Sequence, residues 1–143
     1  MVVKIVNKSN NPNPKYAKPG DSGMDIRTFI DEPVVLGPLE RYTFPTGIYL
    51  DIPEGYEIQI RPRSGLTSNQ GLVAQLGTID SSYTGELKIT LINLSNETHT
   101  INSGERIAQI VCAKVEIITL EEVDKIEKIT ERGGNGFGHS GLQ

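Results

Sequence analysis

The segment RPRSGL (61–66) carries residue types that suit the binding of an anion. Arg61 and Arg63 present forked donors beside the hydroxyl of Ser64. Gly65 has no side chain to keep the backbone away from a ligand. Such a group is typical of sites for a phosphate chain. The alternative is an ordinary turn that carries arginines, and a motif this short is more often such a turn than an anion-binding site.

The segment GTIDSSYTGE (77–86) places Asp80 between two expected strands and follows it with Tyr83. A carboxylate within hydrogen-bond reach of a water molecule can take its proton as a general base. The same Asp could instead bond its own backbone in a turn, and the local sequence taken alone favours this plainer role.

Two further segments carry polar groups near expected strand ends. GERIAQIV (104–111) supplies Arg106 and Gln109 at the start of a strand, where a polar side chain normally faces solvent. The glycine-rich C-terminal tail offers Arg132 and Phe137. A flexible arm with one aromatic anchor could close over a flat ring, and a frayed terminus is the alternative.

The sequence gives little support for a metal site built from protein ligands or for a Ser–His–Asp triad. His99 and His139 are isolated, and no His, Cys or acidic spacing matches a metal cage. The single Cys112 excludes an intrachain disulfide and is expected to be a small core residue. A Ser–His–Asp triad stays open by counting, but no nucleophile-elbow context is present.

The elements that must position these residues are expected to be β-strands. The chain has 17 Ile and 9 Val against 4 Ala, a composition that fits pleated, half-buried surfaces. Apolar and polar residues alternate in 55–61, 86–92 and 106–117, and less regularly in 24–30 and 47–53. Turn signals recur about every ten residues, which favours a sandwich, barrel or jelly roll.

Three segments depart from this pattern. Residues 9–23 form a long polar connection with three prolines. Residues 119–132 are rich in charge, and we expect either a short helix or an extended strand there. The tail, 133–143, holds five glycines and cannot bury enough surface to order itself.

Length and charge limit the class of protein. A chain of 143 residues makes one domain. The net charge is −4 and the pI about 5.2, which argues against a nucleic-acid-binding face. No apolar run approaches the roughly 18 residues of a membrane span, and the N-terminus lacks the apolar block of a signal peptide. We therefore expect a cytoplasmic, or otherwise intracellular, protein with no nucleic-acid or membrane partner.

Five segments in order resemble the motifs of the trimeric all-β dUTPases, the deoxyuridine 5′-triphosphate nucleotidohydrolases. They are AKPGDSGMDI (17–26), RPRSGL (61–66), GTIDSSYTGE (77–86), GERIAQIV (104–111) and RGGNGFGHSG (132–141). The resemblance implies an all-β single domain over residues 1–128 with a distorted jelly-roll, or β-clip, fold. It also implies a flexible glycine-rich arm, residues 129–143, that closes over the active site.

The resemblance implies hydrolysis of dUTP to dUMP and pyrophosphate. Asp80 matches the general base that activates a water for in-line attack on the α-phosphorus. Tyr83 matches the aromatic residue that packs on the deoxyribose and leaves no room for a 2′-hydroxyl. The hairpin backbone at Thr78 and Ile79, and out to Lys88, matches the part that reads the uracil edge.

Phosphate and metal binding are implied in the same way. Arg63, Ser64 and Gly65 match the phosphate-binding turn, and Gln109 matches a further phosphate contact. Mg²⁺, bound through the substrate phosphates rather than by the protein directly, is the implied cofactor. Asp25 matches the aspartate that orders water and cation near the phosphates.

The arm and the assembly complete the implied site. Arg132 matches the arginine that reaches the γ-phosphate, and Phe137 matches the ring that stacks on uracil. Donors from Gly138 to Ser140 flank that ring, with His139 able to cap the γ-phosphate. The family also implies a homotrimer whose active sites are shared between subunits.

The chain departs from the family pattern at some positions. Many relatives place an Asn shortly before the third motif, whereas this chain has Ala74 and Gln75, which leaves the base contact to Gln75 or to backbone alone. Thr84 stands where an Arg is common. Two alternatives share the fold: a dCTP deaminase, against which the stacking arm and the Tyr83 hairpin argue, and a regulatory protein that binds nucleotide and protein partners.

Overall fold

The computed structural model describes residues 1–138, which form short strands and one short helix, α1 (Ser64–Gln70). The all-β prediction is thereby confirmed. No helix in this range is long and apolar enough to cross a membrane. The strands are β1 (Lys4–Asn7), β2 (Gly23–Arg27), β3 (Val34–Leu36), β4 (Arg41–Asp51), β5 (Tyr56–Arg61), β6 (Leu72–Ala74), β7 (Gly77–Ile79), β8 (Glu86–Asn93), β9 (His99–Ile101) and β10 (Arg106–Lys114).

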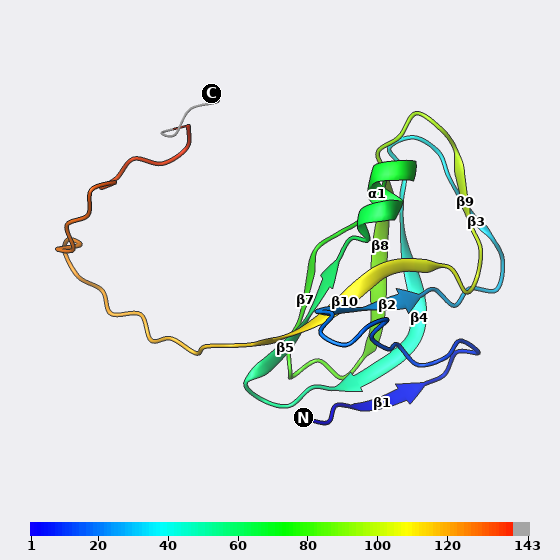
Figure 1. Cartoon of the computed structure of the whole chain (residues 1–143), viewed down its shortest axis with the longest axis horizontal. Coiled ribbons are helices and arrows are strands. Elements are labelled where there is room, and N and C mark those ends of the chain that lie inside the picture. Colours follow the sequence, from blue (N-terminus) through cyan, green and yellow to red (C-terminus); the bar gives the residue numbers. More distant parts are fainter. Residues whose placement is uncertain (139–143) are drawn as a thin grey trace.

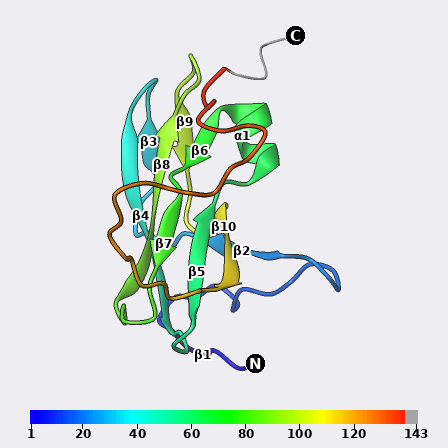
Figure 2. The same ribbon diagram turned by 90° about the vertical axis from the view of Figure 1, so that its left-hand side faces the viewer.

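One apolar core joins two four-stranded antiparallel sheets (Figures 1 and 2). The strand order is β1-β4-β8-β6 in the first sheet and β2-β10-β5-β7 in the second, and β3 pairs separately with β9. Leu87, Ile89 and Leu91 of β8 are buried in the same cluster as Ile58 and Ile60 of β5. This burial follows the alternation that the sequence predicts for both strands.

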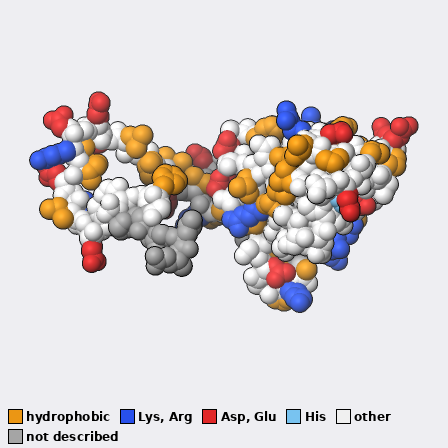
Figure 3. Space-filling model, turned by 90° about the horizontal axis from the view of Figure 1, so that it is seen from above, with side chains coloured by type: hydrophobic (Ala, Val, Ile, Leu, Met, Phe, Trp, Pro, Cys, Tyr) orange, Lys and Arg blue, Asp and Glu red, His pale blue; other side chains and the backbone are white. Residues whose placement is uncertain are grey.

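The segment after β10 corrects one prediction. Residues 119–132 form neither a helix nor a strand, and the chain leaves the domain as an irregular segment (Figure 1). Its apolar side chains are exposed, including 87% of Leu120 and 95% of Ile129, and Figure 3 shows hydrophobic side chains on its surface. Without a sheet or a core beside it, the apolar pattern has nothing within residues 1–138 to pack against.

The segment RPRSGL continues into a helix and not only into a turn. Pro62 and Arg63 turn the chain after β5, and α1 begins at Ser64. Gly71 ends the helix with φ +69°, a left-handed conformation that glycine adopts without strain. Ser64 and Gly65 are exposed as a result, on the first turn of α1.

Leu39 carries backbone strain in a turn. Among the described residues it is the only non-glycine with positive φ, +66°, in a turn where Glu40 N–H donates to Gly37 O. A β-carbon in this conformation costs about 1–2 kcal/mol. The side chain is 78% exposed and so contributes little burial in return.

We expect Leu39→Gly to raise the free energy of unfolding by about 0.5–1 kcal/mol, because relief of strain exceeds the entropy that glycine adds to the unfolded chain. Urea unfolding at fixed protein concentration measures the difference. Leu39→Ala is the matched control, since it shortens the side chain but keeps the β-carbon. Equal stabilisation by both variants would assign the effect to the exposed side chain instead of the backbone.

Candidate active site

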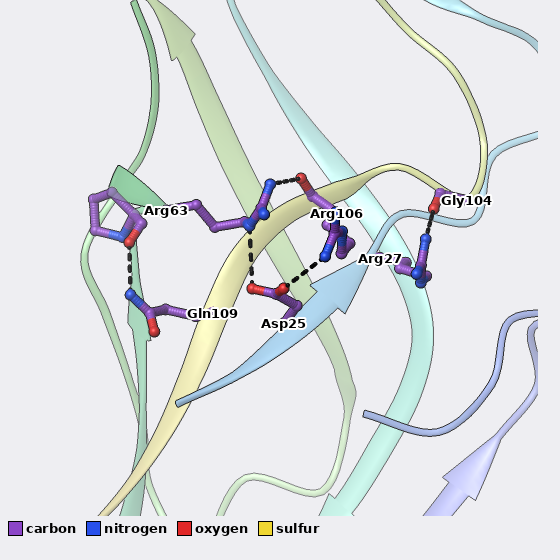
Figure 4. Close-up of polar contacts among 7 residues, drawn as sticks. Asp25, Arg27, Arg63, Gly104, Arg106 and Gln109 are labelled. Atoms are coloured by element: carbon purple, nitrogen blue, oxygen red, sulfur yellow. Dashed lines mark hydrogen bonds and ion pairs between the residues drawn. The ribbon is translucent and has the colours of Figure 1, made fainter. Parts of the chain in front are cut away.

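Three strands bring four polar side chains together on the second sheet (Figure 4). Asp25 lies on β2, Arg63 follows β5, and Arg106 and Gln109 lie on β10. Because β10 pairs with both β2 and β5, Gln109 is opposite Asp25 on one side and Arg61 on the other. We call Asp25, Arg63, Arg106 and Gln109 the charged cluster.

Asp25 holds both arginines of the charged cluster. Its Oδ1 accepts from Arg63 Nε at 3.1 Å, and its Oδ2 accepts from Arg106 Nη1 at 3.3 Å. Arg63 Nη1 also donates to the carbonyl oxygen of Arg106 at 3.3 Å. A guanidinium has five N–H donors, so these bonds leave most of the Arg63 fork available to an anion.

Arg106 is a member of the cluster that sequence reasoning did not include among the site residues. A β-bulge between Arg106 and Ala108 shifts the pairing of β10 with β2. The extra residue, Ile107, is buried together with Ala108, so strict alternation fails here. Arg106 therefore lies on the face of the sheet that carries Asp25 and Gln109, and no period-two pattern could have shown this.

The amide of Gln109 lies against a glycine and points toward the turn after β5. Its Nε2 donates to Pro62 O at 2.9 Å. A β-carbon at Gly23 would lie 2.3 Å from Gln109 Oε1, so only glycine there leaves room for this amide. The contact places Gln109 beside the chain that leads into Ser64 and Gly65, as the anion-binding prediction requires.

The described residues fit a divalent cation only as the partner of a bound polyphosphate. Within residues 1–138 no group of three or more His, Cys, Asp or Glu could hold a metal ion. Both oxygens of Asp25 already accept bonds from arginines. Mg²⁺ usually keeps several waters and binds one or two carboxylates plus substrate phosphates, and this donor set is compatible with such an ion.

A second group of site residues surrounds the turn between β7 and β8, and we call it the hairpin pocket. A shallow hollow of about 240 Å³ is lined by Thr78, Ile79, Asp80, Tyr83, Glu86 and Lys88. Asp80 is exposed, and its carbonyl oxygen accepts from Tyr83 N–H at 3.0 Å. The structure thus brings together every residue predicted from this motif, with Glu86 in addition.

The charged cluster and the hairpin pocket of one chain lie far apart. β5 pairs antiparallel with β7, and Ile58 is opposite Ile79. Asp80 follows Ile79 directly, so it is level with Glu57, near the end of β5 that is remote from Arg63. The six residue steps from Glu57 to Arg63, at roughly 3.3 Å each, separate the two groups by about 20 Å along the chain.

Of the predicted arm residues, Arg132 and Phe137 contact neither group in this conformation. Arg132 Nε donates to Asn135 O at 2.7 Å within the arm itself. Phe137 is fully exposed, and Figure 1 shows this part of the chain well away from the sheets. Gly138 ends the described range, and the predicted ligands His139 and Ser140 lie outside it.

Solved structures of phage dUTPases share the fold of this chain. The dUTPase of Staphylococcus bacteriophage 80alpha with dUpNHpp is similar, with a TM-score of 0.89 and 30% identity over 99% of each chain. A mutant dUTPase from phage phi11 of S. aureus, solved for the coordination of a structural Mg(II) ion, has a TM-score of 0.81 and 27% identity over 90% of this chain and 100% of that chain. Fold and site together define an all-β enzyme of nucleotide metabolism.

Sequence comparison identifies the family. A model of the dUTPase family matches residues 9–141. The chain is 55% identical over 143 residues to the deoxyuridine 5′-triphosphate nucleotidohydrolase of Finegoldia magna, covering 99% of both. It is 49% identical over 141 residues to that of Fusobacterium nucleatum, covering 97% of this chain and 96% of the relative. The chain belongs to the dUTPase family, and the resemblance of its five motifs is confirmed.

Proposed function

We propose that this dUTPase family member hydrolyses dUTP to dUMP and pyrophosphate with Asp80 as the general base. Asp80 takes a proton from a water molecule, whose oxygen attacks the α-phosphorus. The bond from this phosphorus to the α–β bridging oxygen breaks, and pyrophosphate leaves in line. The observation that carries the proposal is the hairpin pocket, which gathers the exposed Asp80 carboxylate and Tyr83 in one turn.

The hairpin pocket also suits the nucleoside. β7 is an edge strand of its sheet, so the outer backbone groups of Thr78 and Ile79 have no strand partner among the described residues. Unpaired N–H and C=O groups along a strand edge can match the donors and acceptors of a base. In the proposed complex these groups, with the backbone at Lys88, read uracil, and the Tyr83 ring packs on the deoxyribose.

The charged cluster supplies cations for the triphosphate. The protein carries a net charge of −4, so it must gather positive charge locally to hold a polyanion. In the proposed complex Arg63 and Gln109 bind the phosphates together with Ser64 and Gly65. Mg²⁺ bound through the same phosphates would neutralise the charge that builds up on the leaving pyrophosphate.

Asp25 acts in this proposal mainly by holding Arg63. We expect Asp25→Asn to lower kcat/KM for dUTP about fivefold, or about 1 kcal/mol, because the amide lacks the charge that orients the guanidinium. The Mg²⁺ concentration for half-maximal activity is expected to stay unchanged. Steady-state kinetics over a Mg²⁺ titration measure both quantities, with Asp31→Asn, an exposed loop carboxylate, as the control. A large rise in the Mg²⁺ requirement would make Asp25 a cation ligand instead.

We propose further that the active site forms between subunits of a homotrimer. A base that acts on the α-phosphorus must lie within one water of the phosphates. The separation of about 20 Å along β5, at roughly 3.3 Å per residue, prevents Asp80 and Arg63 of one chain from sharing a substrate. Asp80 of one subunit with Arg63 and Gln109 of another would complete the site.

The arm, residues 129–143, closes over the bound nucleotide in this proposal. Arg132 then reaches the γ-phosphate and Phe137 stacks on uracil, with Gly138 offering a backbone donor and His139 and Ser140 following it. The exposure of Phe137 supports this role, because a ring that packs on nothing in its own domain is free to pack on a base.

Pyrophosphate release from dUTP in the presence of Mg²⁺ tests the proposed function. We expect release from dUTP and none from dCTP at the same concentration. Formation of dUTP and ammonia from dCTP would favour the deaminase alternative. Binding of a non-hydrolysable dUTP analogue without turnover of dUTP would favour a regulatory protein.

We also propose a cytoplasmic location, in keeping with the unpaired Cys112.

A further inference from the structure

The ring of Tyr83 occupies the place where a side chain at position 85 would begin. A β-carbon built on Gly85 would lie 2.6 Å from Tyr83 Oη, 2.7 Å from Cζ and 3.1 Å from Cε1. The first two distances are shorter than real β-carbon contacts. Any residue other than glycine at position 85 therefore forces the ring to move.

The backbone does not explain why glycine stands at position 85. Seven glycines within the described residues have positive φ, and Gly85 is not among them. Its φ therefore lies outside the left-handed region, where an alanine would be strained. The glycine is thus required by the space that Tyr83 fills and not by the turn itself.

Two hydrogen bonds fix the ring over Gly85. Tyr83 Oη donates to Glu86 O at 2.7 Å, and Tyr83 N–H donates to Asp80 O at 3.0 Å. Glu86 is itself tied to the first sheet, because its Oε2 accepts from Gly47 N–H at 2.9 Å. The ring is nevertheless 43% exposed, so it can contact a ligand in the hairpin pocket.

We propose that Gly85 is a positioning residue that sets the discrimination between deoxyribonucleotides and ribonucleotides. The inference rests on the proposed function, in which the Tyr83 ring packs on the deoxyribose and excludes a 2′-hydroxyl. Gly85 acts through that ring: it leaves the space that the ring fills, and from this position the ring closes the space beside the sugar. A methyl group at position 85 displaces the ring and opens this space.

The kcat/KM values for dUTP and UTP test the proposal in four proteins: wild type, Gly85→Ala, Tyr83→Ala and the double variant. When a pocket rejects an added hydroxyl by its shape alone, kcat/KM for the two substrates differs by about a hundredfold. We expect Gly85→Ala to lower the ratio of kcat/KM for dUTP to kcat/KM for UTP roughly tenfold. The double variant is expected to match Tyr83→Ala, since Gly85 has no ring left to position. Thr84→Ala, an exposed change in the same turn, is the matched control and should keep the wild-type preference.

Each outcome decides the matter. An unchanged preference in Gly85→Ala, or a further loss in the double variant beyond Tyr83→Ala, overturns the proposal. If Gly85→Ala does not fold but the double variant does, the clash is with the ring, as proposed. If neither folds, Gly85 serves something other than Tyr83 and the proposal is wrong. A wild-type protein without dUTP hydrolysis would refute the proposed function itself, a result distinct from all of these.

Discussion

Asp80→Asn is expected to lower kcat for dUTP hydrolysis by about 10²–10⁴-fold, the range that a positioned general base contributes. The amide keeps the shape of the carboxylate but cannot accept the proton of the attacking water. The backbone bond from Tyr83 N–H to Asp80 O does not involve the side chain, so the hairpin is expected to keep its geometry. Initial rates of pyrophosphate release measure the loss.

The nucleotide affinity of Asp80→Asn distinguishes a role of Asp80 as general base from a merely structural role. The variant should bind a non-hydrolysable dUTP analogue with an affinity close to that of the wild type, because other residues hold the phosphates in the proposed complex. Asp51→Asn, an exposed carboxylate at the end of β4, is the matched control and should keep full activity. A kcat for Asp80→Asn within a few-fold of the wild type would contradict the assignment of the base.

Two inactive variants are expected to regain activity when they assemble together. Asp80→Asn removes the proposed base, and Arg63→Ala removes a cation from the charged cluster, so each variant alone should be nearly inactive in the proposed homotrimer. In randomly mixed trimers with shared sites, about a quarter of the sites would pair an intact Asp80 with an intact Arg63. The separation of these two residues along β5 is the physical reason for the expectation.

Co-refolded subunits, one of them carrying a tag, provide the measurement. Native mass spectrometry establishes that the variants have mixed, and pyrophosphate release gives the recovered activity. Asp80→Asn mixed with Asp80→Ala is the control, because both variants lack the same half of the site and no recovery is expected. Mixed trimers without recovered activity would place the complete site within one chain.

Local patterns in the sequence were sufficient to predict β5 and β8. In both strands apolar residues alternate with polar ones, and Ile58, Ile60 and Ile89 are buried as that period requires. The residues of the hairpin pocket came from the resemblance to the dUTPase motifs, because the local pattern alone favoured a plain turn at Asp80.

Contacts between distant segments could not be predicted in the same way. The separation of Asp80 from Arg63 depends on the register of β5 against β7, about which alternation carries no information. The place of Arg106 in the charged cluster depends on a bulge in β10. The segment 119–132 has an apolar pattern but no partner in the described part of the chain, so neither of the expected elements forms.

The ion pairs of Asp25 also determine when the phosphate site can form during folding. Arg63 is 38 positions along the chain from Asp25, and Arg106 is 81 positions from it. Closing loops of this length is entropically costly, and contacts between remote positions form slowly. A partly folded or nascent chain that lacks β10 is therefore not expected to form the proposed nucleotide site. A ligand that binds only the folded protein stabilises it by mass action. The nucleotide present in the cell would therefore raise the free energy of unfolding of this protein.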